Sequence, residues 1–564
     1  MKAISWLGLF AIIASATLQG AEKEERPNIL VILADDLGYS DLGCYGGEIR
    51  TPNLDTLASD GLRFTQTYNS SRCCPSRASL LTGLYPHQAG IGRFVGGGKL
   101  PGYRGKLTER CVTIAEVLRP AGYGTYACGK WHVNNPGPIE RGFDEFYGFV
   151  HGYAIDSWNP SMMIRLPEGR PQRAYPEGEY FATDAITDHA LDFLELARKK
   201  DQPWLLYVGY QAPHFPVQAP PELSETYLET YSKGWDLIRA QRLAKMKLLG
   251  LVDPALPLPP RAPIDRIDVA KRNGSMTPNG MNPAWKSLDA GRQADLARRM
   301  AVYAAMVDNM DQNIGRLVKD LREQGELDNT LILFLSDNGA CAEWEPFGFD
   351  LNAADYSENK PGFGISTSTP KKPNVRHRGE ELAAMGGPGS LFSYGSAWAN
   401  VCNTPLSLYK HYAHEGGIRT PMIAHWPAGI KKPGDRPHVT HLMDIMATCL
   451  ELGKAEYPGY EGAKILPPEG RSLVPAFANK PDKPRTLIFE HEHNVAIRQA
   501  DWKLISENGL GKTGIRPGAV WSLYDLSNDP SEQHDLAPEQ PERVKAMTAE
   551  FLSEAKRTLV LPAP

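Results

Sequence analysis

The sequence predicts a large α/β core followed by a smaller C-terminal unit, which consists of an antiparallel sheet and one helix. Continuous apolar runs such as residues 28–34 alternate with amphipathic helical segments, which indicates strands buried on both faces of a sheet covered by helices. At 564 residues the chain is far longer than one typical domain. After about residue 456 the predicted strands become short and follow one another closely, as in a small antiparallel sheet.

Residues 1–21 have the composition of a secretory signal peptide. Lys2 gives a short positive region, residues 6–14 are apolar, and small residues at 14–16 or 20–21 offer a cleavage site. The apolar run is too short to span a membrane, and no other stretch reaches ~18 apolar residues. We therefore expect an exported protein, periplasmic or secreted, with no stable membrane span.

Composition narrows the classes of partner. The formal net charge is −5, and the 61 basic and 66 acidic side chains are mixed along the chain, so no basic surface for nucleic acid is expected. Eight cysteines are few for this length, which excludes a scaffold held together by disulfides.

The core is expected to occupy residues 22–455. Its strands are predicted at residues 28–34, in a run ending at 68, and at 124–128, 204–210, 331–335 and 421–425. Its helices are predicted at residues 53–59, 112–119, 185–200 and 222–251, and a long amphipathic helix runs from Leu296 to a glycine cap at Gly325. Residues 220–284 include a proline-rich stretch and are expected to form an insertion.

Two further regions complete the expected architecture. Residues 344–396 are rich in Gly, Pro, Ser and charge and are too long for a plain connector, which suggests a loop over a binding site. In the C-terminal unit, residues 456–564, strands are predicted at 486–489, 495–498, 502–506 and 521–525, and the last helix at 542–557.

The stretch from residue 69 to residue 83 contains a candidate reaction centre. Pro75 suits the first turn of a short helix, which places Cys73 at or just before the helix N-terminus. The unpaired N–H groups and the dipole at such an end favour an anion. Arg77 lies one turn further on, so its guanidinium can return to the same position. The alternative is a buried thiol at a helix start with a surface arginine.

Seven side chains that can bind ligands or move protons follow predicted core strands at their carboxyl ends. In an open α/β sheet, ligands bind at this edge. A single such residue could be incidental, but seven at the same edge indicate a functional site. They are Asp35, Asp36, Lys130, His132, His214, Asp337 and Asn338.

Four of the seven offer hard oxygen ligands. Asp35 and Asp36 are adjacent carboxylates directly after a core strand, so they repel each other and favour a nearby cation; a solvated turn is the alternative. No histidine pair or cysteine stands beside the four in the sequence, which favours Ca²⁺ or Mg²⁺ over Zn²⁺. The candidate ligands are Asp35, Asp36, Asp337 and Asn338.

The run Cys73-Cys74-Pro75-Ser76-Arg77, continued by Leu81-Thr82-Gly83, resembles the Cys-x-Pro-Ser-Arg…Thr-Gly signature of the formylglycine-dependent sulfatases. The resemblance covers residues 27–430 closely and the C-terminal part loosely. It implies an alkaline phosphatase-like fold, in which helices sandwich a large mixed sheet. It also implies that a formylglycine-generating maturation enzyme oxidises Cys73 to Cα-formylglycine, whose hydrated aldehyde is the nucleophile, and that Cys74 is the variable position.

The resemblance also assigns the other site residues. Lys130 and His132 match the family's Gly-Lys-Trp-His element, His214 matches the histidine after a core strand, and Lys410 stands five residues before Glu415 of the Glu-Gly-Gly element. The implied catalytic residues are Cys73, Arg77, Lys130, His132, His214 and Lys410. One divalent cation, usually calcium and otherwise magnesium, is implied, with the ligands Asp35, Asp36, Cys73 as formylglycine, Asp337 and Asn338.

These residues predict an exported sulfatase that hydrolyses aryl or carbohydrate sulfate monoesters to an alcohol and inorganic sulfate. In the implied mechanism His214 protonates the leaving oxygen and His132 accepts a proton when sulfate is expelled. A phosphoester hydrolase of the same superfold is the first alternative, because a cation and basic side chains suit either anion. A catalytically silent binder of sulfated glycans, with Cys73 unmodified, is the second.

Overall fold

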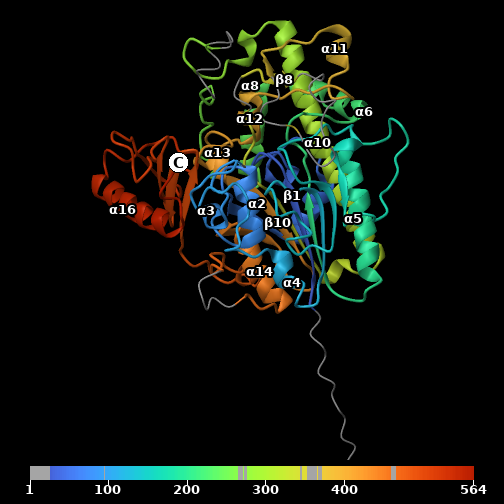
Figure 1. Cartoon of the computed structure of the whole chain (residues 1–564). Coiled ribbons are helices and arrows are strands. Elements are labelled where there is room, and N and C mark those ends of the chain that lie inside the picture. Colours follow the sequence, from blue (N-terminus) through green and yellow to red (C-terminus); the bar gives the residue numbers. More distant parts are fainter. Residues whose placement is uncertain are drawn as a thin grey trace, which may run out of the picture.

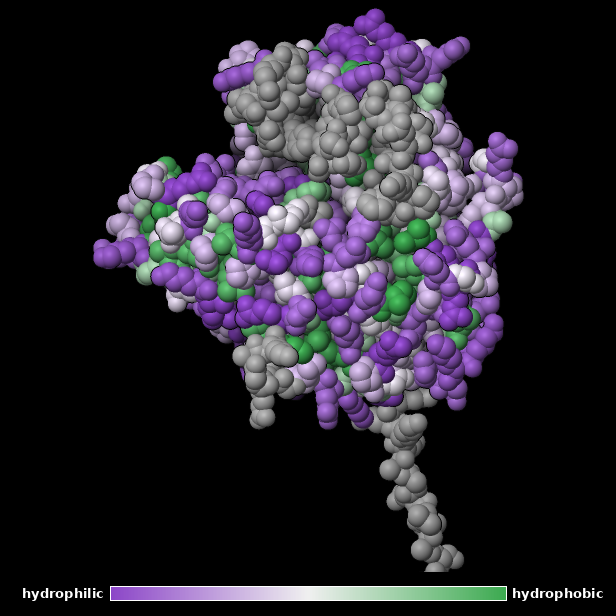
Figure 2. Space-filling view, viewed as in Figure 1, coloured by the Kyte–Doolittle hydropathy of each residue, from purple (hydrophilic) through white to green (hydrophobic). Residues whose placement is uncertain are grey.

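The computed structural model describes residues 26–564, apart from residue 95 and residues 265–270, 272–275, 343–345, 352–364, 366–370 and 459–464. The expected signal peptide, residues 1–21, lies outside this part of the chain. None of the helices within the described ranges is both long and apolar enough to cross a membrane. The face seen in Figure 2 is mainly hydrophilic, with hydrophobic residues scattered across it.

A mixed sheet of nine strands forms the centre of the molecule (Figure 1). Four neighbouring strands run parallel, and they are β7 (Thr330–Ser336), β1 (Asn28–Ala34), β6 (Trp204–Gly209) and β3 (Gly124–Lys130). Beyond β3, the sheet continues with parallel β4 (Glu145–Phe149) and antiparallel β5 (Ile164–Leu166). Beyond β7 lie antiparallel β10 (Arg419–His425), then β2 (Leu62–Tyr68) and β11 (Gly434–His441), which pair in parallel with each other.

Helices cover both faces of the sheet, and successive side chains of β1 point to opposite layers. Leu30 and Ile32 pack in the core that contains the buried face of α10 (Ala290–Glu323), whereas Ile29 and Val31 pack in the core that contains α2 (Cys73–Thr82). All four are fully buried, as expected of a strand that is apolar throughout. The predicted fold class, a large mixed sheet sandwiched by helices, is therefore confirmed.

Most of the predicted helices lie within a few residues of their expected positions. The long helix begins at Ala290, six residues before the expected start at Leu296, and the helix at Asp444–Gly453 and the shorter helices were not predicted. Those that pack on the sheet are α1 (Pro52–Asp60), α2 (Cys73–Thr82), α4 (Ile114–Leu118), α5 (Ala182–Arg198), α10 (Ala290–Glu323) and α14 (Asp444–Gly453). Shorter helices are α3 (Pro86–Ala89), α11 (Gly379–Ala383), α12 (Ser396–Cys402), α13 (Glu415–Ile418) and α15 (Val474–Phe477).

The single helix expected at residues 222–251 is three helices in the structure: α6 (Pro221–Glu225), α7 (Leu228–Ser232) and α8 (Trp235–Leu248). Gly234, which precedes α8, has a left-handed φ of 85°. A Cβ atom at this position would lie 2.1 Å from the indole of Trp285, so only glycine fits this close contact. The break therefore depends on a tertiary contact that helical periodicity cannot reveal.

Strands β4, β5 and β11 were not predicted from the sequence. β11 contains Pro437 and several charged side chains, and it pairs on only one side, with β2. An edge strand tolerates proline and polar residues because half of its backbone groups need no partner in the sheet. Such a strand therefore lacks the continuous apolar run by which the central strands were recognised.

The C-terminal unit contains the predicted antiparallel sheet and helix. Its strands are β12 (Thr486–His491), β13 (Asn494–Gln499), β14 (Trp502–Ser506) and β15 (Ser522–Asp525), and α16 (Pro541–Arg557) packs on them. The hydrophobic core of this unit also contains Tyr68 at the end of β2 and Ile418 of α13, so it is anchored to the large sheet. Figure 1 shows it beside α13 and α3.

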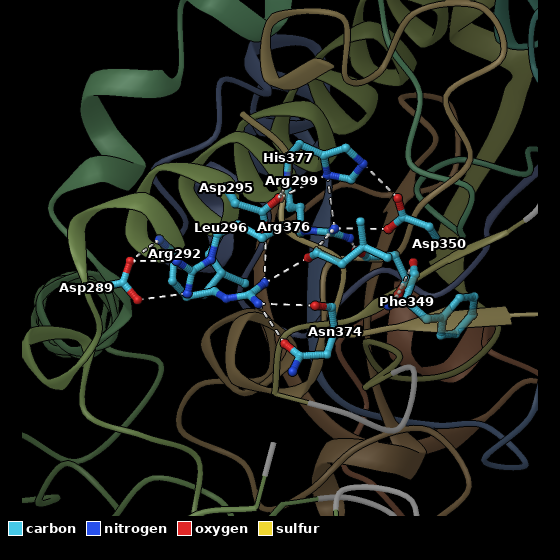
Figure 3. Close-up of polar contacts among 12 residues, drawn as sticks. Asp289, Arg292, Asp295, Leu296, Arg299, Phe349, Asp350, Asn374, Arg376 and His377 are labelled. Carbon is cyan, nitrogen blue, oxygen red and sulfur yellow. Dashed lines mark hydrogen bonds and ion pairs between the residues drawn. The ribbon is translucent and has the colours of Figure 1, made fainter. Parts of the chain in front are cut away.

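The long loop expected at residues 344–396 is held against α10 where the structure describes it. His377 joins Asp295 of α10 (Nδ1–Oδ1 3.0 Å) to Asp350 of β8 (Phe349–Leu351; Nε2–Oδ2 2.8 Å), and Arg299 contacts both carboxylates (Figure 3). The same β8 strand places the ring of Phe349 5.2 Å from Phe215. Because Phe215 follows His214, the loop passes next to the expected site.

Candidate active site

The carboxyl ends of β1, β7, β6 and β3 bring the predicted site residues together. The pairing of Ala34 with Ser336 places the residues that follow β1 beside those that follow β7. The pairing of Gly129 with Gly209 aligns the end of β3 with β6 in the same way. All seven strand-end residues predicted from the sequence are buried at this edge, together with Cys73, Arg77 and Lys410.

Asp35 and Lys130 form a fully buried ion pair. The Lys130 ammonium lies 2.5 Å from Asp35 Oδ2 and donates a second hydrogen bond, 2.6 Å long, to the carbonyl oxygen of Tyr153. Burial raises the pKa of Asp35 to about 7, with a further contribution from Asp337, against the opposing effect of Lys130. The Lys130 ammonium therefore offsets part of the cost of burying the Asp35 carboxylate.

Asp36 lies at the meeting point of three other site residues. Lys410 Nζ is 2.7 Å from its Oδ1, Asn338 Nδ2 donates to Oδ1 at 2.6 Å, and His214 Nε2 is 3.4 Å from Oδ2. Burial alone would raise the pKa of Asp36, but His214 and Lys410 outweigh it and lower the pKa to about 2. Its φ of 66° is left-handed, a conformation that a non-glycine residue keeps only where its surroundings enforce it.

The guanidinium of Arg77 binds the carboxylate of Asp337. Its Nε donates to Asp337 Oδ2 at 2.9 Å, and Nη1 donates to the Lys130 carbonyl at 2.8 Å and to the Tyr207 hydroxyl at 3.2 Å. Burial raises the pKa of Asp337, and Arg77 opposes that rise. The guanidinium interacts electrostatically with Cys73, as expected one helical turn on, and its hydrogen bonds orient the Asp337 carboxylate. Its Nη2 lies 2.9 Å from Asp337 Oδ2 but makes no hydrogen bond to any residue that the structure describes, so this atom is available to an anion in the site.

Cys73 is the first residue of α2, which begins two residues earlier than the predicted helix start at Pro75. Its sulfur lies within 4.8 Å of the Cys74 sulfur and of a ring nitrogen of His132. Burial raises the pKa of the Cys73 thiol, yet Cys74, His132 and Lys130 together bring it well below its usual range. Cys73 is a free thiol in the structure.

The rings of His214 and His132 are held in place by different contacts. His214 Nδ1 lies 2.5 Å from the carbonyl oxygen of Phe215, which can only accept, so the proton is on Nδ1 and Nε2 faces Asp36. His132 has a left-handed φ of 56° and packs edge-on against Phe94 at 5.4 Å. Burial lowers the pKa of each histidine to about 4. Both rings are therefore neutral at pH 7 before an anion binds.

The expected oxygen ligands fit a hard divalent cation. Oδ1 of Asp35 and Oδ1 of Asn338 are buried, and neither accepts a hydrogen bond from any residue that the structure describes. Unpartnered buried oxygens are costly, and a cation would satisfy both. Asp36 and Asp337 lie at the same edge, so the four expected ligands offer only oxygen, which suits Ca²⁺ or Mg²⁺. A ring nitrogen of His214 also lies within 4.8 Å of carboxylate oxygens of Asp35 and Asp36.

Lys410 reaches the site from a loop rather than from a strand. Its backbone N–H donates to Ala340, which follows the Asp337-Asn338-Gly339 turn. Gly339 packs directly on the Glu-Gly-Gly element, since a Cβ there would lie 1.7 Å from the Gly416 carbonyl oxygen. The close packing of Gly339 on Gly416 therefore places the loop that carries Lys410 next to Asp36.

Sequence reasoning missed several contributors to the site. Tyr207 resembles an ordinary residue of an apolar strand. Tyr153 contributes its backbone carbonyl to Lys130, and its ring lies 6.1 Å from that of His214, but neither tyrosine carries a sequence signal. Ser336 Oγ accepts from the Leu37 N–H and donates to the Asn338 carbonyl, which ties the two acidic turns together. Ser336 could have been found from the sequence, because it is a polar residue at the end of an otherwise apolar strand.

Comparisons with known proteins agree with this geometry. A sequence model of the sulfatase family matches residues 27–455, and one described as N-sulphoglucosamine sulphohydrolase, C-terminal, matches residues 407–558. An uncharacterized sulfatase of Schizosaccharomyces pombe is 34% identical over 570 residues, covering 96% of both chains. The arylsulfatase of Klebsiella aerogenes is 34% identical over 473 residues, covering 80% of this chain and 92% of its own.

A solved structure has the same fold over nearly the whole chain. The crystal structure of Ps i-CgsB in complex with k-i-k-neocarrahexaose superposes with a TM-score of 0.61 and 25% sequence identity, covering 94% of this chain and 93% of that one. The family match spans more than half of the chain, and two relatives exceed 30% identity over most of it. This chain therefore belongs to the sulfatase family and is a sulfuric ester hydrolase.

Proposed function

We propose that this sulfuric ester hydrolase is exported and cleaves aryl or carbohydrate sulfate monoesters, with Cα-formylglycine at position 73 as the nucleophile. One observation carries the proposal: the start of α2 brings Cys73 next to His132, while Arg77 of the same helix holds Asp337. The substrate class is supported by the arylsulfatase relative and by the carbohydrate bound to Ps i-CgsB.

Asp35, Asp36, Asp337 and Asn338, with residue 73, would hold one divalent cation, Ca²⁺ or Mg²⁺. When bound, the cation supplies positive charge that stabilises the negative charge developing on oxygen. Lys130 and Lys410 contribute in the same sense, because each places its ammonium at a buried carboxylate of the site. These two lysines would neutralise the oxygens of the sulfuryl group.

Asp337 would accept the proton of the attacking hydroxyl at position 73. The raised pKa of this carboxyl makes it a better base than an exposed aspartate, and its hydrogen bond to Arg77 fixes its orientation. The expected role of Arg77 at the sulfuryl oxygens stays a prediction, and the contacts favour a role in orienting Asp337. A formylglycine hydrate carries a second hydroxyl, which permits release of sulfate after transfer; an ordinary thiol does not.

The two histidines would move protons on opposite sides of the reaction. His214 would donate a proton to the leaving oxygen, and His132, next to residue 73, would take one when sulfate departs. Burial keeps both rings neutral without substrate, and an anionic sulfate ester would raise their pKa values by bringing negative charge close. His214 would thus acquire its proton as the substrate binds.

The proposal is tested by chemistry at position 73. Mass spectrometry of the tryptic peptide should show conversion of Cys73, and not of Cys74, in active protein coexpressed with a formylglycine-generating enzyme. Cys73→Ala should abolish release of sulfate from 4-nitrophenyl sulfate, while Cys74→Ala keeps most of it. Substantial residual turnover in Cys73→Ala, or faster hydrolysis of 4-nitrophenyl phosphate than of the sulfate, would contradict the proposal. N-terminal sequencing of exported protein tests cleavage near residue 21.

A further inference from the structure

A polar cluster lies beside the nucleophile position and outside the residues assigned so far. Two of its members are the chain neighbours of Cys73 and Lys410. The other two lie at the tip of the hairpin between β12 and β13 in the C-terminal unit. We call this set the hairpin cluster: Arg72, His411, His491 and Glu492.

The members of the hairpin cluster are in direct contact. Arg72 Nη1 lies 2.7 Å from His411 Nδ1 and 3.6 Å from Glu492 Oε1. Glu492 also lies 3.6 Å from His411 Nδ1, through Oε2, and 3.6 Å from His491 Nε2, through Oε1. The backbone of His411 donates to the carbonyl of Ser71 at 2.9 Å. The hairpin tip is therefore held against the segment that carries the nucleophile.

Several polar atoms of the hairpin cluster lack a hydrogen-bond partner among the described residues. His491 is only 1% exposed, yet neither of its ring nitrogens makes a hydrogen bond, and the buried Nε of Arg72 makes none. The side chain of Glu492 is 48% exposed. The cluster thus extends from a buried, unsatisfied imidazole to a carboxylate that solvent can reach, which indicates room for a polar ligand.

The hairpin tip has an unfavourable backbone for its residue types. Paired residues His491 and Asn494 flank a two-residue loop, in which Glu492 and His493 have φ values of 49° and 74°. Glycine or asparagine is the usual residue in such left-handed turns. A glutamate here strains the backbone, and strain of this kind is found where a side chain is needed for function.

The hairpin cluster faces the space next to the reacting residue. The guanidinium of Arg72 stacks over the ring of Phe94 at 4.6 Å, and the same ring contacts His132 at 5.4 Å. A molecule whose sulfate lies at Cys73 therefore has Phe94 and the hairpin cluster beside it. These groups would contact the part of the substrate that leaves.

The chemistry of the cluster selects a hydroxylated leaving group. Arg72 and neutral imidazoles donate hydrogen bonds, and Glu492 accepts them, which matches the alternating donors and acceptors of a sugar. An apolar aryl group would leave these atoms unsatisfied, and a second anion would be repelled by Glu492. We propose that the hairpin cluster is a specificity site that binds hydroxyl groups of a sugar whose sulfate ester is cleaved at residue 73. This inference rests on the proposed function.

The experiment compares substrates that share the sulfate but differ in the leaving group. We would measure kcat/KM of the mature enzyme for 4-nitrophenyl sulfate and for monosulfated galactose and N-acetylglucosamine. Glu492→Gln and His491→Gln should lower the ratio of the sugar value to the nitrophenyl value by at least about 10-fold. The matched control is Glu539→Gln, because Glu539 is an exposed carboxylate of the same unit, and it should not change this ratio.

Glu492→Gly separates binding from folding. Glycine relieves the left-handed strain, so the Tm should stay the same or rise while the ratio falls as in Glu492→Gln. Equal losses on both substrate classes, or an unchanged ratio, would overturn the inference but leave the proposed function standing. The inference would also be overturned if the enzyme hydrolysed the nitrophenyl ester but no sugar sulfate. A stoichiometric zinc ion that is present in wild type and absent from His491→Gln would overturn it as well. Wild-type enzyme that hydrolyses no sulfate ester would reject both.

Discussion

The ammonium of Lys410 lies 2.7 Å from Oδ1 and 2.9 Å from Oδ2 of Asp36, although 374 positions separate the two residues in the chain. Both side chains are buried, at 4% and 0% exposure. The pair therefore joins the turn after the first strand to a loop that precedes the Glu-Gly-Gly element. It also explains why Lys410, which follows no strand, belongs to the site.

Lys410→Met should reduce kcat/KM for 4-nitrophenyl sulfate by about 10²–10³, because it removes one positive charge from the region where sulfuryl charge develops. Methionine fills similar space, so the loss should come without a large change in Tm. The matched control is Lys432→Met, on an exposed side chain away from the site. A loss below about threefold would place Lys410 outside the reaction.

Removal of an oxygen ligand should lower the metal content of the protein. Protein purified without chelator should contain about one divalent ion per chain, with Ca²⁺ or Mg²⁺ preferred. Asn338→Leu should bind that ion at least about tenfold more weakly, because Oδ1 of Asn338, like Oδ1 of Asp35, is a buried ligand oxygen that accepts no hydrogen bond from a described residue. Metal analysis and calcium titration give the readout independently of activity. Stoichiometric zinc that acts as the best activator would contradict the assignment.

The contribution of His377 to stability should depend on pH. Hydrogen bonds that the His377 ring donates to the carboxylates of Asp295 and Asp350 raise the pKa of His377 to about 9, above the unfolded value of about 6.5. A raised folded pKa stabilises the protein fully below pH ~6.5, and the stabilisation is lost as pH rises through about 9. The Tm difference between wild type and His377→Gln should therefore be about 1–3 °C at pH 6 and shrink by pH 9.5, since solvent screens a partly exposed ring.

The control for this prediction is His534→Gln, on an exposed histidine of the C-terminal unit. Its Tm difference from wild type should show no matching trend between pH 6 and pH 9.5. If the His377 difference were independent of pH, the ring would act through packing alone. The loop would then owe its position on α10 to Arg299, which contacts the same two carboxylates.

The sequence predicted the parts of the site that depend on strand order and strand ends. β1 and β7 are apolar throughout, so their ends at Asp35 and Asp337 could be located without a structure, and parallel pairing then brings them together. The extent of α10 from Leu296 onward followed from its regular apolar spacing, whereas its first residues, 290–295, were not predicted. These features are local in the sequence or follow from general rules of sheet topology.

Contacts between distant surface elements could not be predicted in this way. The hairpin tip at Glu492 reaches Arg72 only because the C-terminal unit packs on Tyr68 and Ile418. No period or motif encodes that docking, since it depends on the shapes of two separate units. The break between α7 and α8 has a similar origin, in the contact of Gly234 with Trp285. The boundary expected at residue 456 stays a prediction.

The assignment of His214 as general acid predicts a dependence on the leaving group. A nitrophenolate departs nearly unassisted, whereas a sugar alkoxide needs a proton in the transition state. His214→Ala should therefore slow hydrolysis of an alkyl or sugar sulfate by about 10²–10⁴ and that of 4-nitrophenyl sulfate by much less.

The measurement is kcat/KM for wild type and His214→Ala over aryl sulfates of graded leaving-group pKa. The fixed tautomer, with Nδ1 bonded to the Phe215 carbonyl and Nε2 toward the site, gives the ring only one atom from which to donate. A steeper dependence on leaving-group pKa in the variant supports the assignment, because the missing proton matters more as the leaving group becomes more basic. Equal losses across the series would mean that His214 only positions the sulfate, and Lys410 would then be the candidate acid.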